Sequence, residues 1–239
     1  MEIRDWRLEI GRFAQHPTSN LQRPGKDEIH VWRASLDLPA IDLRQLQQTL
    51  TEDESNRAAR FYFQKDREHY IACRGLLRVI LSRYLDVAPG EIRFCYGHYG
   101  KPELASSMRR QDLSFNVSHS HGLALVAIAA ERKIGVDIEY IRLGVEIESI
   151  AERFFAPNEK AVIRTLTGYQ QRETFYNCWT RKEAFLKACG DGMTCPLDQF
   201  EVSVAPGVPA ALISARDDPQ AARWSLQELG VADGYVATV

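Results

Sequence analysis

Alternating polar and apolar residues, and longer stretches with helical periodicity, divide the chain into an ordered series of elements. Residues 28–36 alternate strictly, which predicts a strand, whereas 66–85 carries apolar side chains at helical spacing. Thr51 and Glu54 have the spacing of a capping box, so a helix is expected to follow through Phe61. The other predicted strands are 91–96, 113–119, 123–130, 133–140, 200–204, 211–214, 224–229 and 235–239. The other predicted helices are 42–50, 147–155, 158–167 and 171–189.

A short internal similarity organises this series of elements. Residues 67–75 resemble residues 182–190, with Glu68 opposite Glu183 at an offset of 115 positions. In this register Ala72 stands opposite Lys187, so the first half lacks the lysine of the second half. We therefore expect one active site in each chain rather than two. We therefore predict an α+β fold of two similar halves with the active site in a cleft between them. The expected parts are an N-terminal extension (1–27), a first half (28–112) and a second half (113–239).

Composition narrows the class of protein. The 239 residues are 45% hydrophobic and 26% charged, which is typical of a globular protein. A formal net charge of −2 argues against a general nucleic-acid-binding protein, which usually carries a strong basic excess. The longest apolar run, 122–130, is too short to cross a membrane as a helix, and five cysteines without a Cys-x-x-Cys pair indicate free thiols. We expect a cytoplasmic protein that binds neither membrane nor nucleic acid.

Two acids stand on one predicted strand. Side chains alternate along a strand, so Asp137 and Glu139 project from the same face, while Val136 and Ile138 face a core. Adjacent carboxylates repel unless a cation or a proton lies between them, and oxygen ligands favour a hard cation such as Mg²⁺. A half-solvated edge strand with two surface acids is an equally good interpretation of this pattern alone.

A third acid lies on a predicted helix. Glu183 and Lys187 are four residues apart and share a helix face, an arrangement most often explained as a solvated ion pair. The functional interpretation is a third metal carboxylate beside an ammonium group that binds phosphate.

Further polar groups lie at a strand end and in a turn. Asn116, Ser118 and His119 could bind phosphate oxygens, although ordinary turn residues would look the same. Ser118 and His119 do not indicate a serine hydrolase, because neighbouring strand residues face opposite ways and a Gly-x-Ser-x-Gly elbow is absent. The turn Gly100-Lys101-Pro102 is a weak signal by itself.

Together these motifs are specific through their order and spacing. The chain resembles the 4′-phosphopantetheinyl transferases of the Sfp type, which are single chains built as pseudodimers. The resemblance covers about residues 28–204. It rests on Tyr99-Gly100-Lys101-Pro102, Phe115-Asn116-Val117-Ser118-His119-Ser120, Gly135-Val136-Asp137-Ile138-Glu139, Arg153-Phe154-Phe155 and Trp179-x-x-Lys182-Glu183-Ala184-Phe185-x-Lys187.

The resemblance implies a role for each matching residue. Asp137, Glu139 and Glu183 would hold Mg²⁺, with Mn²⁺ as an alternative, and Lys187 would contact the pyrophosphate and protonate the leaving phosphate. Either Glu183 or Glu159 would act as the base, and the sequence does not choose between them. The residues implied in binding coenzyme A are Arg57, Gly100, Lys101, Pro102, Asn116, Ser118, His119 and Lys187.

The implied reaction transfers the phosphopantetheine arm of coenzyme A to a serine of an apo acyl or peptidyl carrier protein. The second product would be adenosine 3′,5′-bisphosphate. The carrier is expected to dock near residues 190–205, and the enzyme is expected to be a monomer. Two alternatives remain open at this point: a Mg²⁺-dependent nucleotide phosphohydrolase, and a non-enzymatic module that binds coenzyme A or a carrier protein.

Overall fold

The computed structural model describes residues 1–7, 22–97, 100–108, 113–190, 195–215 and 223–239. It divides the chain into two compact units, 1–133 and 134–239. This boundary lies later than the one expected after residue 112, so the hairpin 113–130 belongs to unit 1. Within the described residues, no helix combines the length and apolar character needed to cross a membrane.

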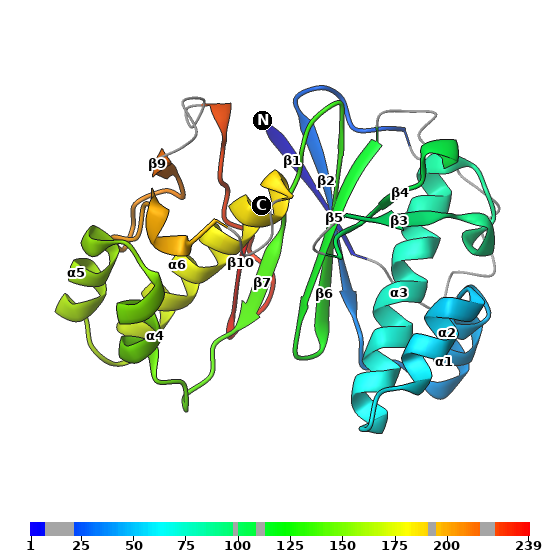
Figure 1. Cartoon of the computed structure of the whole chain (residues 1–239), viewed down its shortest axis with the longest axis horizontal. Helices are drawn as coiled ribbons and strands as arrows, with labels where there is room; N and C mark the ends of the chain where they lie inside the picture. The colour runs from blue at the N-terminus through cyan, green and yellow to red at the C-terminus, as the bar shows by residue number, and fades with distance from the viewer. Residues whose placement is uncertain (8–21, 98–99, 109–112, 191–194, 216–222) are drawn as a thin grey trace. The chain divides into compact units, whose positions relative to one another are not determined.

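Unit 1 is built on a four-stranded sheet with the order β1-β2-β6-β5 (Figure 1). The strands are β1 (Glu2–Arg7), β2 (Glu28–Ser35), β5 (Leu113–Ser120) and β6 (Leu123–Ala130). β1 pairs with β2 in parallel, and the other neighbours are antiparallel. The N-terminal segment is therefore partly a strand of this sheet rather than an extension outside it. Its short, mixed sequence gave no sign of this, because the pairing depends on a strand more than 20 residues away.

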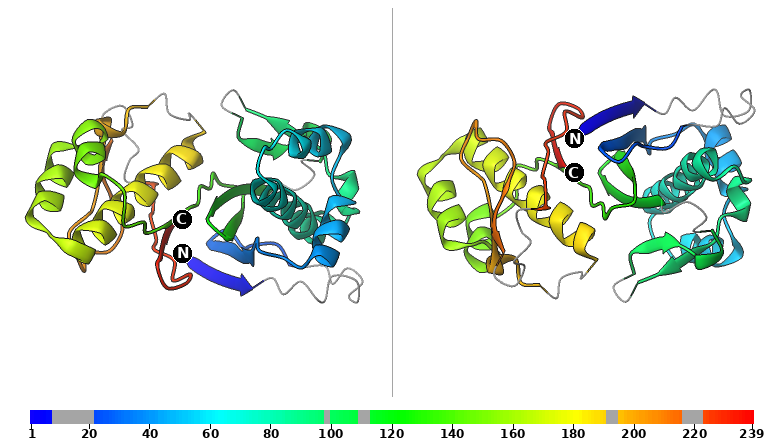
Figure 2. Two further views of the ribbon diagram at one scale, coloured as in Figure 1. Left: turned by 90° about the horizontal axis from the view of Figure 1, so that it is seen from below. Right: turned by 90° about the horizontal axis from the view of Figure 1, so that it is seen from above.

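Three α-helices, two 3₁₀ turns and a small hairpin are the other described elements of unit 1. They are α1 (Ala40–Gln47), α2 (Glu52–Ala59), α3 (Gln64–Leu85), the 3₁₀ turns η2 (Pro89–Glu91) and η3 (Ser106–Met108), and the strands β3 (Phe94–Tyr96) and β4 (Pro102–Leu104). Leu76, Leu77 and Ile80 of α3 pack in one core with Val126 and Ile128 of β6. Figure 2 shows α3 lying along one face of the sheet. The capping box predicted at Thr51 is present.

Unit 2 surrounds a second long helix. Its elements are β7 (Asp137–Tyr140), α4 (Ile147–Phe154), α5 (Pro157–Thr165), α6 (Gly168–Cys189), η5 (Leu197–Gln199), β8 (Phe200–Val202), β9 (Leu212–Ala215) and β10 (Tyr235–Thr238). β7 pairs with β10 and β8 pairs with β9, both antiparallel. The predicted strand 224–229 is reduced to one bridge, between Glu228 and Thr238. Phe175, Phe185 and Leu186 of α6 lie in the core of this unit.

Both units repeat one order of elements, but in a different register from the one expected. Each has a strand, two short helices, a 22-residue helix, a 3₁₀ turn and a hairpin. The long helices begin at Gln64 and at Gly168, which sets the offset at 104 positions instead of 115. In the structural register Glu183 corresponds to Val79, and the expected pairing of Glu68 with Glu183 is wrong.

Glycine positions show why the sequence match was misleading. Gly190 follows α6 with a φ of 84° and caps the helix, and its counterpart is Asp86, which caps α3 with a φ of 54°. Gly75, which the sequence match set opposite Gly190, lies inside α3. A Cβ there would stand 2.7 Å from Leu46 Cβ of α1, so this glycine allows close helix packing and is not a cap.

Candidate active site

The two acids of β7 lie where the strand meets α6. Asp137 is buried and Glu139 is half-buried, while Ile138 between them is fully buried on the other face. The alternation predicted from the sequence is therefore present. β10 fixes the strand by main-chain pairing, with Thr238 opposite Asp137 and Val236 opposite Glu139. Two carboxylates are thus held on one face of a short, well-supported strand.

Lys187 of α6 reaches directly to these acids. Its Nζ donates to Asp137 Oδ1 at 2.6 Å and to the carbonyl oxygen of Val136 at 3.3 Å. The Lys187 side chain keeps 28% of its surface exposed, while the Asp137 side chain keeps 5%. The Lys187 ammonium group is therefore bound to Asp137, while part of the lysine side chain remains accessible to solvent.

Glu183 belongs to the same cluster. Burial raises the pKa of its carboxyl group, the negative charge of Asp137 raises it further, and Glu139 adds a smaller contribution in the same direction. The Lys187 ammonium opposes this rise in the pKa. The structure thus brings together four residues that the sequence singled out, three acids and one lysine, from two elements of unit 2. Such a cluster favours an added cation because the three acids repel one another.

Close contact between β7 and α6 depends on Gly135, the first residue of the sequence motif that contains the two acids. A Cβ on Gly135 would stand 2.0 Å from the carbonyl oxygen of Ala184 and 2.6 Å from the backbone nitrogen of Ala188. Any side chain at this position would push the strand away from the helix. A glycine two residues before a strand with two acids was the signal that could have revealed this approach.

The donor set fits a hard divalent cation by its chemistry. Carboxylate oxygens are the ligands that Mg²⁺ and Mn²⁺ prefer, and Asp137 already binds a cation in this structure, the Lys187 ammonium. As the side chains stand, no group of three His, Cys, Asp or Glu within the described ranges is arranged to hold a metal ion. Metal binding here would therefore require these side chains to move towards one ion.

Glu159, the other candidate base, is placed differently. It is fully buried, and its Oε2 accepts a hydrogen bond from the backbone N–H of Ala156 at 2.8 Å. Its Oε1 accepts from the backbone N–H of Val202 at 2.8 Å and lies 2.8 Å from Lys182 Nζ, which is also fully buried. Lys182 is part of the sequence motif Trp179-x-x-Lys182-Glu183, which by itself assigns it no role.

The candidate coenzyme A residues on β5 and in the β3–β4 hairpin belong to unit 1. Asn116 and Ser118 are buried, whereas His119 is exposed on the opposite face of the same strand. Gly100 has a φ of 77°, a conformation that favours glycine, and the turn is closed by a hydrogen bond from Gly97 N to Lys101 O. Pro102 begins β4. Tyr99, which the motif also includes, lies outside the described residues.

Arg57, the remaining coenzyme A candidate, is exposed on α2. Its guanidinium lies 5.6 Å from the ring centre of Tyr70. It lines an open groove of about 550 Å³ together with Asp53, Arg60 and Phe61. This groove of mixed charge is consistent with the binding of a charged ligand, and unit 1 alone forms the walls named here.

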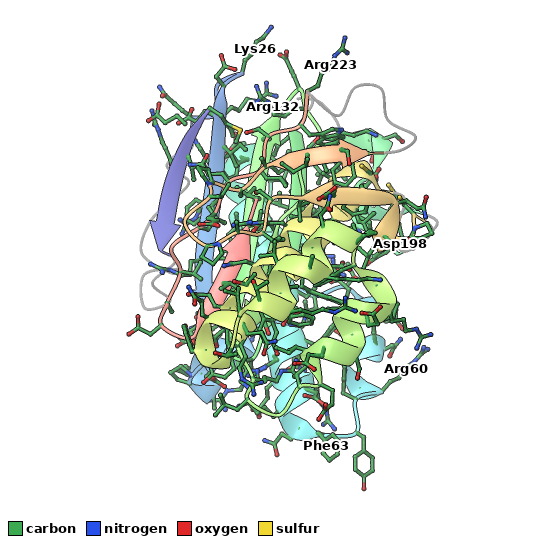
Figure 3. The ribbon with its side chains drawn as sticks, turned by 90° about the vertical axis from the view of Figure 1, so that its left-hand side faces the viewer. Lys26, Arg60, Phe63, Arg132, Asp198 and Arg223 are labelled. Atoms are coloured by element: carbon green, nitrogen blue, oxygen red, sulfur yellow. The ribbon has the colours of Figure 1, made fainter. Side chains whose placement is uncertain are left out.

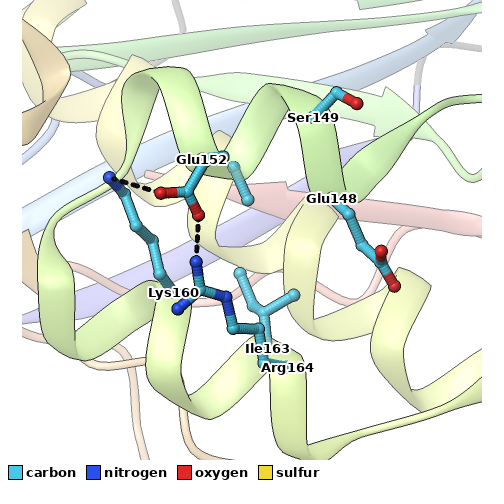
Figure 4. Close-up of a pocket in the computed structure, with 7 residues that line it drawn as sticks. Glu148, Ser149, Glu152, Lys160, Ile163 and Arg164 are labelled. Atoms are coloured by element: carbon cyan, nitrogen blue, oxygen red, sulfur yellow. Dashed lines mark hydrogen bonds and ion pairs between the residues drawn. The ribbon is translucent and has the colours of Figure 1, made fainter.

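A second pocket lies on the helices α4 and α5 of unit 2 and contains none of the predicted site residues (Figure 4). Its volume is about 330 Å³. Glu152 points between Lys160 and Arg164 and forms an ion pair with each. These charges neutralise one another, so the pocket gives no indication of a ligand.

Comparison with known proteins connects both units to one family. Residues 133–239 match the model described as the 4′-phosphopantetheinyl transferase superfamily, and residues 32–133 match the one described as 4′-phosphopantetheinyl transferase, N-terminal. The boundary between the two matches coincides with the boundary between the structural units.

Individual relatives agree with this family. The chain is 45% identical over 213 residues to the 4′-phosphopantetheinyl transferase HetI of Nostoc sp., covering 89% of this chain and 87% of the relative. It is 32% identical over 153 residues to the 4′-phosphopantetheinyl transferase Sfp of Bacillus subtilis, covering 64% and 66%. It is 30% identical over 166 residues to the human L-aminoadipate-semialdehyde dehydrogenase-phosphopantetheinyl transferase, covering 66% and 54%.

The matched models together span nearly the whole chain, and HetI matches along most of its own length. The four clustered residues of β7 and α6 also lie within the segment that matches the superfamily model. The chain therefore belongs to the 4′-phosphopantetheinyl transferase superfamily and is an enzyme of its Sfp type.

Proposed function

We propose that this enzyme transfers the 4′-phosphopantetheine arm of coenzyme A to a serine of an apo acyl or peptidyl carrier protein in a Mg²⁺-dependent reaction. The observation that carries the proposal is the cluster of Asp137, Glu139, Glu183 and Lys187 in a chain of this family. The serine Oγ forms a bond to the phosphorus that carries the pantetheine arm. The bond from this phosphorus to the bridging oxygen breaks, and adenosine 3′,5′-bisphosphate leaves.

The three acids would hold the cation, which supplies positive charge at the pyrophosphate when bound. Lys187 holds a proton on Nζ at the edge of this cluster, where it can donate to an oxygen of the leaving phosphate. For the base, accessibility favours the half-buried Glu183 over the fully buried Glu159; burial raises the pKa of both carboxyl groups, so the pKa does not distinguish them. A raised pKa makes a carboxylate a better proton acceptor.

Coenzyme A recognition would draw on unit 1 as well. We assign Arg57 and His119 to the 3′-phosphate, and Gly100, Lys101, Pro102, Asn116 and Ser118 to the adenine and ribose. The exposure of Arg57 and His119 supports their part of this assignment, because a phosphate can reach both from solvent. Asn116 and Ser118 are buried, so the ligand would contact them only at the small part of each residue that remains exposed.

The carrier would dock near residues 190–205. Residues 191–194, which include Met193, lie outside the described residues. Within 195–205, Pro196, Asp198 and Ala205 are exposed, and Figure 3 shows Asp198 pointing outward. Carrier proteins in general present acidic helices, which a basic rim on the enzyme would complement. None of these three residues carries a positive charge, so such a rim would have to come from residues beyond this described segment.

The mass of the carrier protein tests the reaction. Incubating the enzyme with coenzyme A, Mg²⁺ and a panel of apo carrier proteins should increase the carrier mass by one phosphopantetheine arm, and a chelator should prevent the increase. A carrier with its acceptor serine replaced by alanine is the control. Hydrolysis of coenzyme A without any carrier modification would overturn the proposal in favour of a phosphohydrolase, and binding without either reaction would favour a binding module.

A further inference from the structure

A buried ion pair between Glu54 and Arg78 holds the long helix of unit 1 in place, and we call this arrangement a clamp. Glu54, in the first turn of α2, accepts from Arg78 Nε at 2.7 Å, and both side chains are buried. Glu54 also accepts from the backbone N–H of Thr51 at 3.1 Å. Arg78 Nη1 donates to the carbonyl oxygens of Pro89 and Ile92 at 2.9 and 3.0 Å. The pair thus ties α2, α3 and the 3₁₀ turn η2 together.

The same clamp occurs in unit 2. Glu159 in the first turn of α5 lies 2.8 Å from Lys182 Nζ, and it accepts from the backbone N–H that precedes its helix, at Ala156. Lys182 Nζ donates to the carbonyl oxygens of Leu197 and Phe200 at 2.7 and 2.6 Å. This second pair ties α5, α6 and the turn η5 together.

Position in the chain makes the two clamps equivalent. Glu54 and Glu159 are each the third residue of their helix, and Arg78 and Lys182 are each the fifteenth residue of a 22-residue helix. Both cations also lie over a phenylalanine of the following strand: Arg78 is 5.2 Å from the ring centre of Phe94, and Lys182 is 4.4 Å from that of Phe200.

Unit 1 contains the clamp but lacks the acid and the lysine that follow it in unit 2. The positions of α3 that correspond to Glu183 and Lys187 are Val79 and Arg83, so the Glu54–Arg78 pair supports a helix without the site carboxylate. Its role there is to hold the helix. The equivalent contacts of Glu159 indicate the same role in unit 2.

The geometry of Glu159 also disfavours a direct part in proton transfer. A general base must come within hydrogen-bonding reach of the proton that it removes. Both oxygens of Glu159 already accept backbone N–H groups, one also contacts Lys182, and the side chain is fully buried. A substrate hydroxyl would have to displace these contacts inside the core.

Lys182 is adjacent to the proposed catalytic residues in sequence but faces another way. Because successive helical residues turn by about 100°, Lys182 points about 100° away from Glu183 and about 140° away from Lys187. The clamp grips α6 from the side of η5 and β8, while Lys187 contacts β7. Fixing one side of the helix therefore sets the rotation at which Glu183 and Lys187 meet the acids of β7.

We infer that Glu159 is a positioning residue: through Lys182 it fixes the rotation of α6, and thereby the placement of Glu183 and Lys187 beside Asp137 and Glu139. This inference rests on the proposed function of that cluster. It removes Glu159 from the possible bases and gives Lys182, which had no assigned role, a part in building the site.

Binding of Mn²⁺ to the full chain, measured by calorimetry, tests the inference without relying on turnover. Glu159→Gln should weaken Mn²⁺ binding by roughly tenfold or more, as loss of a group that orients metal ligands does. Its rate should recover when Mn²⁺ is raised, and the acid limb of its pH–rate profile should stay in place. The matched variant Glu54→Gln should bind Mn²⁺ as the wild type does.

A role as base would give the opposite pattern. Glu159→Gln would then bind Mn²⁺ normally, lose about 10²–10⁴ in rate at saturating Mn²⁺, and lose the acid limb of the profile, which would overturn the inference. The double variant Glu159→Gln/Lys182→Gln contains no unpaired buried charge and serves if the single variant is unfolded by circular dichroism. It should show the same weakened Mn²⁺ binding, and normal binding would overturn the inference. Failure of the wild type to modify any carrier would instead count against the proposed function.

Discussion

The two long helices of this protein are held in the same way but carry different side chains one and five residues after the cation of the clamp. In α3 the clamp of Glu54 and Arg78 is followed by Val79 and Arg83, whereas in α6 the clamp of Glu159 and Lys182 is followed by Glu183 and Lys187. The scaffold is therefore shared, and the candidate chemistry comes from a few substitutions on one helix face. A buried ion pair next to an active-site motif need not take part in the reaction.

The clamps also differ in what else contacts the acid. Glu54 has a second cation nearby, with Arg74 Nε 3.5 Å from its Oε1. Glu159 has instead the backbone N–H of Val202, which links it to β8. The clamp of unit 1 is thus supported by charge, and the clamp of unit 2 is supported by the main chain of a neighbouring strand.

The largest expected effect is on the rate of carrier modification, and it distinguishes a variant in α6 from a variant in α3. Glu183→Gln should lower the rate of carrier modification by about 10²–10⁴-fold, because it removes the carboxylate proposed as a metal ligand and as the base. Glu68→Gln, at the position that the sequence match set opposite Glu183, should leave the rate unchanged, since Glu68 lies near the start of α3 and accepts from Gln64. Carrier mass over time provides the measurement. Equal losses in both variants would restore the rejected register.

The free energy of unfolding allows a direct comparison of the two clamps. Lys182→Met and Arg78→Met should each lower the free energy of unfolding by about 3–5 kcal/mol, because each leaves a buried carboxylate without its main partner. The loss should be greater for Lys182→Met, since Glu54 keeps Arg74 nearby. Urea unfolding followed by circular dichroism measures both. A greater loss for Arg78→Met would show that Arg74 does not support Glu54.

Two glycines allow a smaller test of how closely the long helices are packed. Gly135→Ala should destabilise the protein by about 1–3 kcal/mol through overpacking, because its Cβ would meet the backbone of α6. Gly75→Ala would meet Leu46 Cβ at 2.7 Å and the Leu46 backbone at 3.1 Å, a less severe overlap than the 2.0 Å approach of a Cβ on Gly135 to the carbonyl oxygen of Ala184. Thermal unfolding should therefore show the greater loss for Gly135→Ala, together with weaker Mn²⁺ binding. Normal Mn²⁺ binding would mean that the approach of β7 to α6 does not shape the site.

The smallest effect concerns acid sensitivity in unit 1. Burial lowers the pKa of His30, whose Nδ1 lies 2.7 Å from the hydroxyl of Tyr84. The unfolded chain therefore binds a proton more readily, so stability should fall as the pH drops below about 6.5 towards the lowered value. His30→Gln should flatten this part of the profile of unfolding free energy against pH. An unchanged slope would assign the acid sensitivity to another group.

Most elements were predictable because their patterns are local. The helices expected at 147–155 and 158–167 appear at Ile147–Phe154 and Pro157–Thr165, and the strand expected at 28–36 appears at Glu28–Ser35. The strand β1 was missed because its partner is distant in sequence. The strand 224–229 was overpredicted because alternation alone does not supply a neighbour to pair with.

The candidate site was predictable to a similar degree. Asp137 and Glu139 on one strand face, and Glu183 and Lys187 on one helix face, follow from spacing, and the structure brings both pairs together. The role of Glu159 was not predictable. Its sequence context suggests a functional acid equally well, and only its contacts with Lys182, Ala156 and Val202 identify a clamp.

The sequence by itself determined the positions of the long helices, the strand with two acids, and the residue types available for metal and phosphate chemistry. These depend on periodicity and on side-chain chemistry, which a linear pattern contains. Tertiary structure decided the register of the internal repeat, the close approach at Gly135 and the separation of Glu159 from the acids around Lys187. Each of these depends on which distant segments meet, and burial there determines whether a carboxylate faces a substrate or supports a helix.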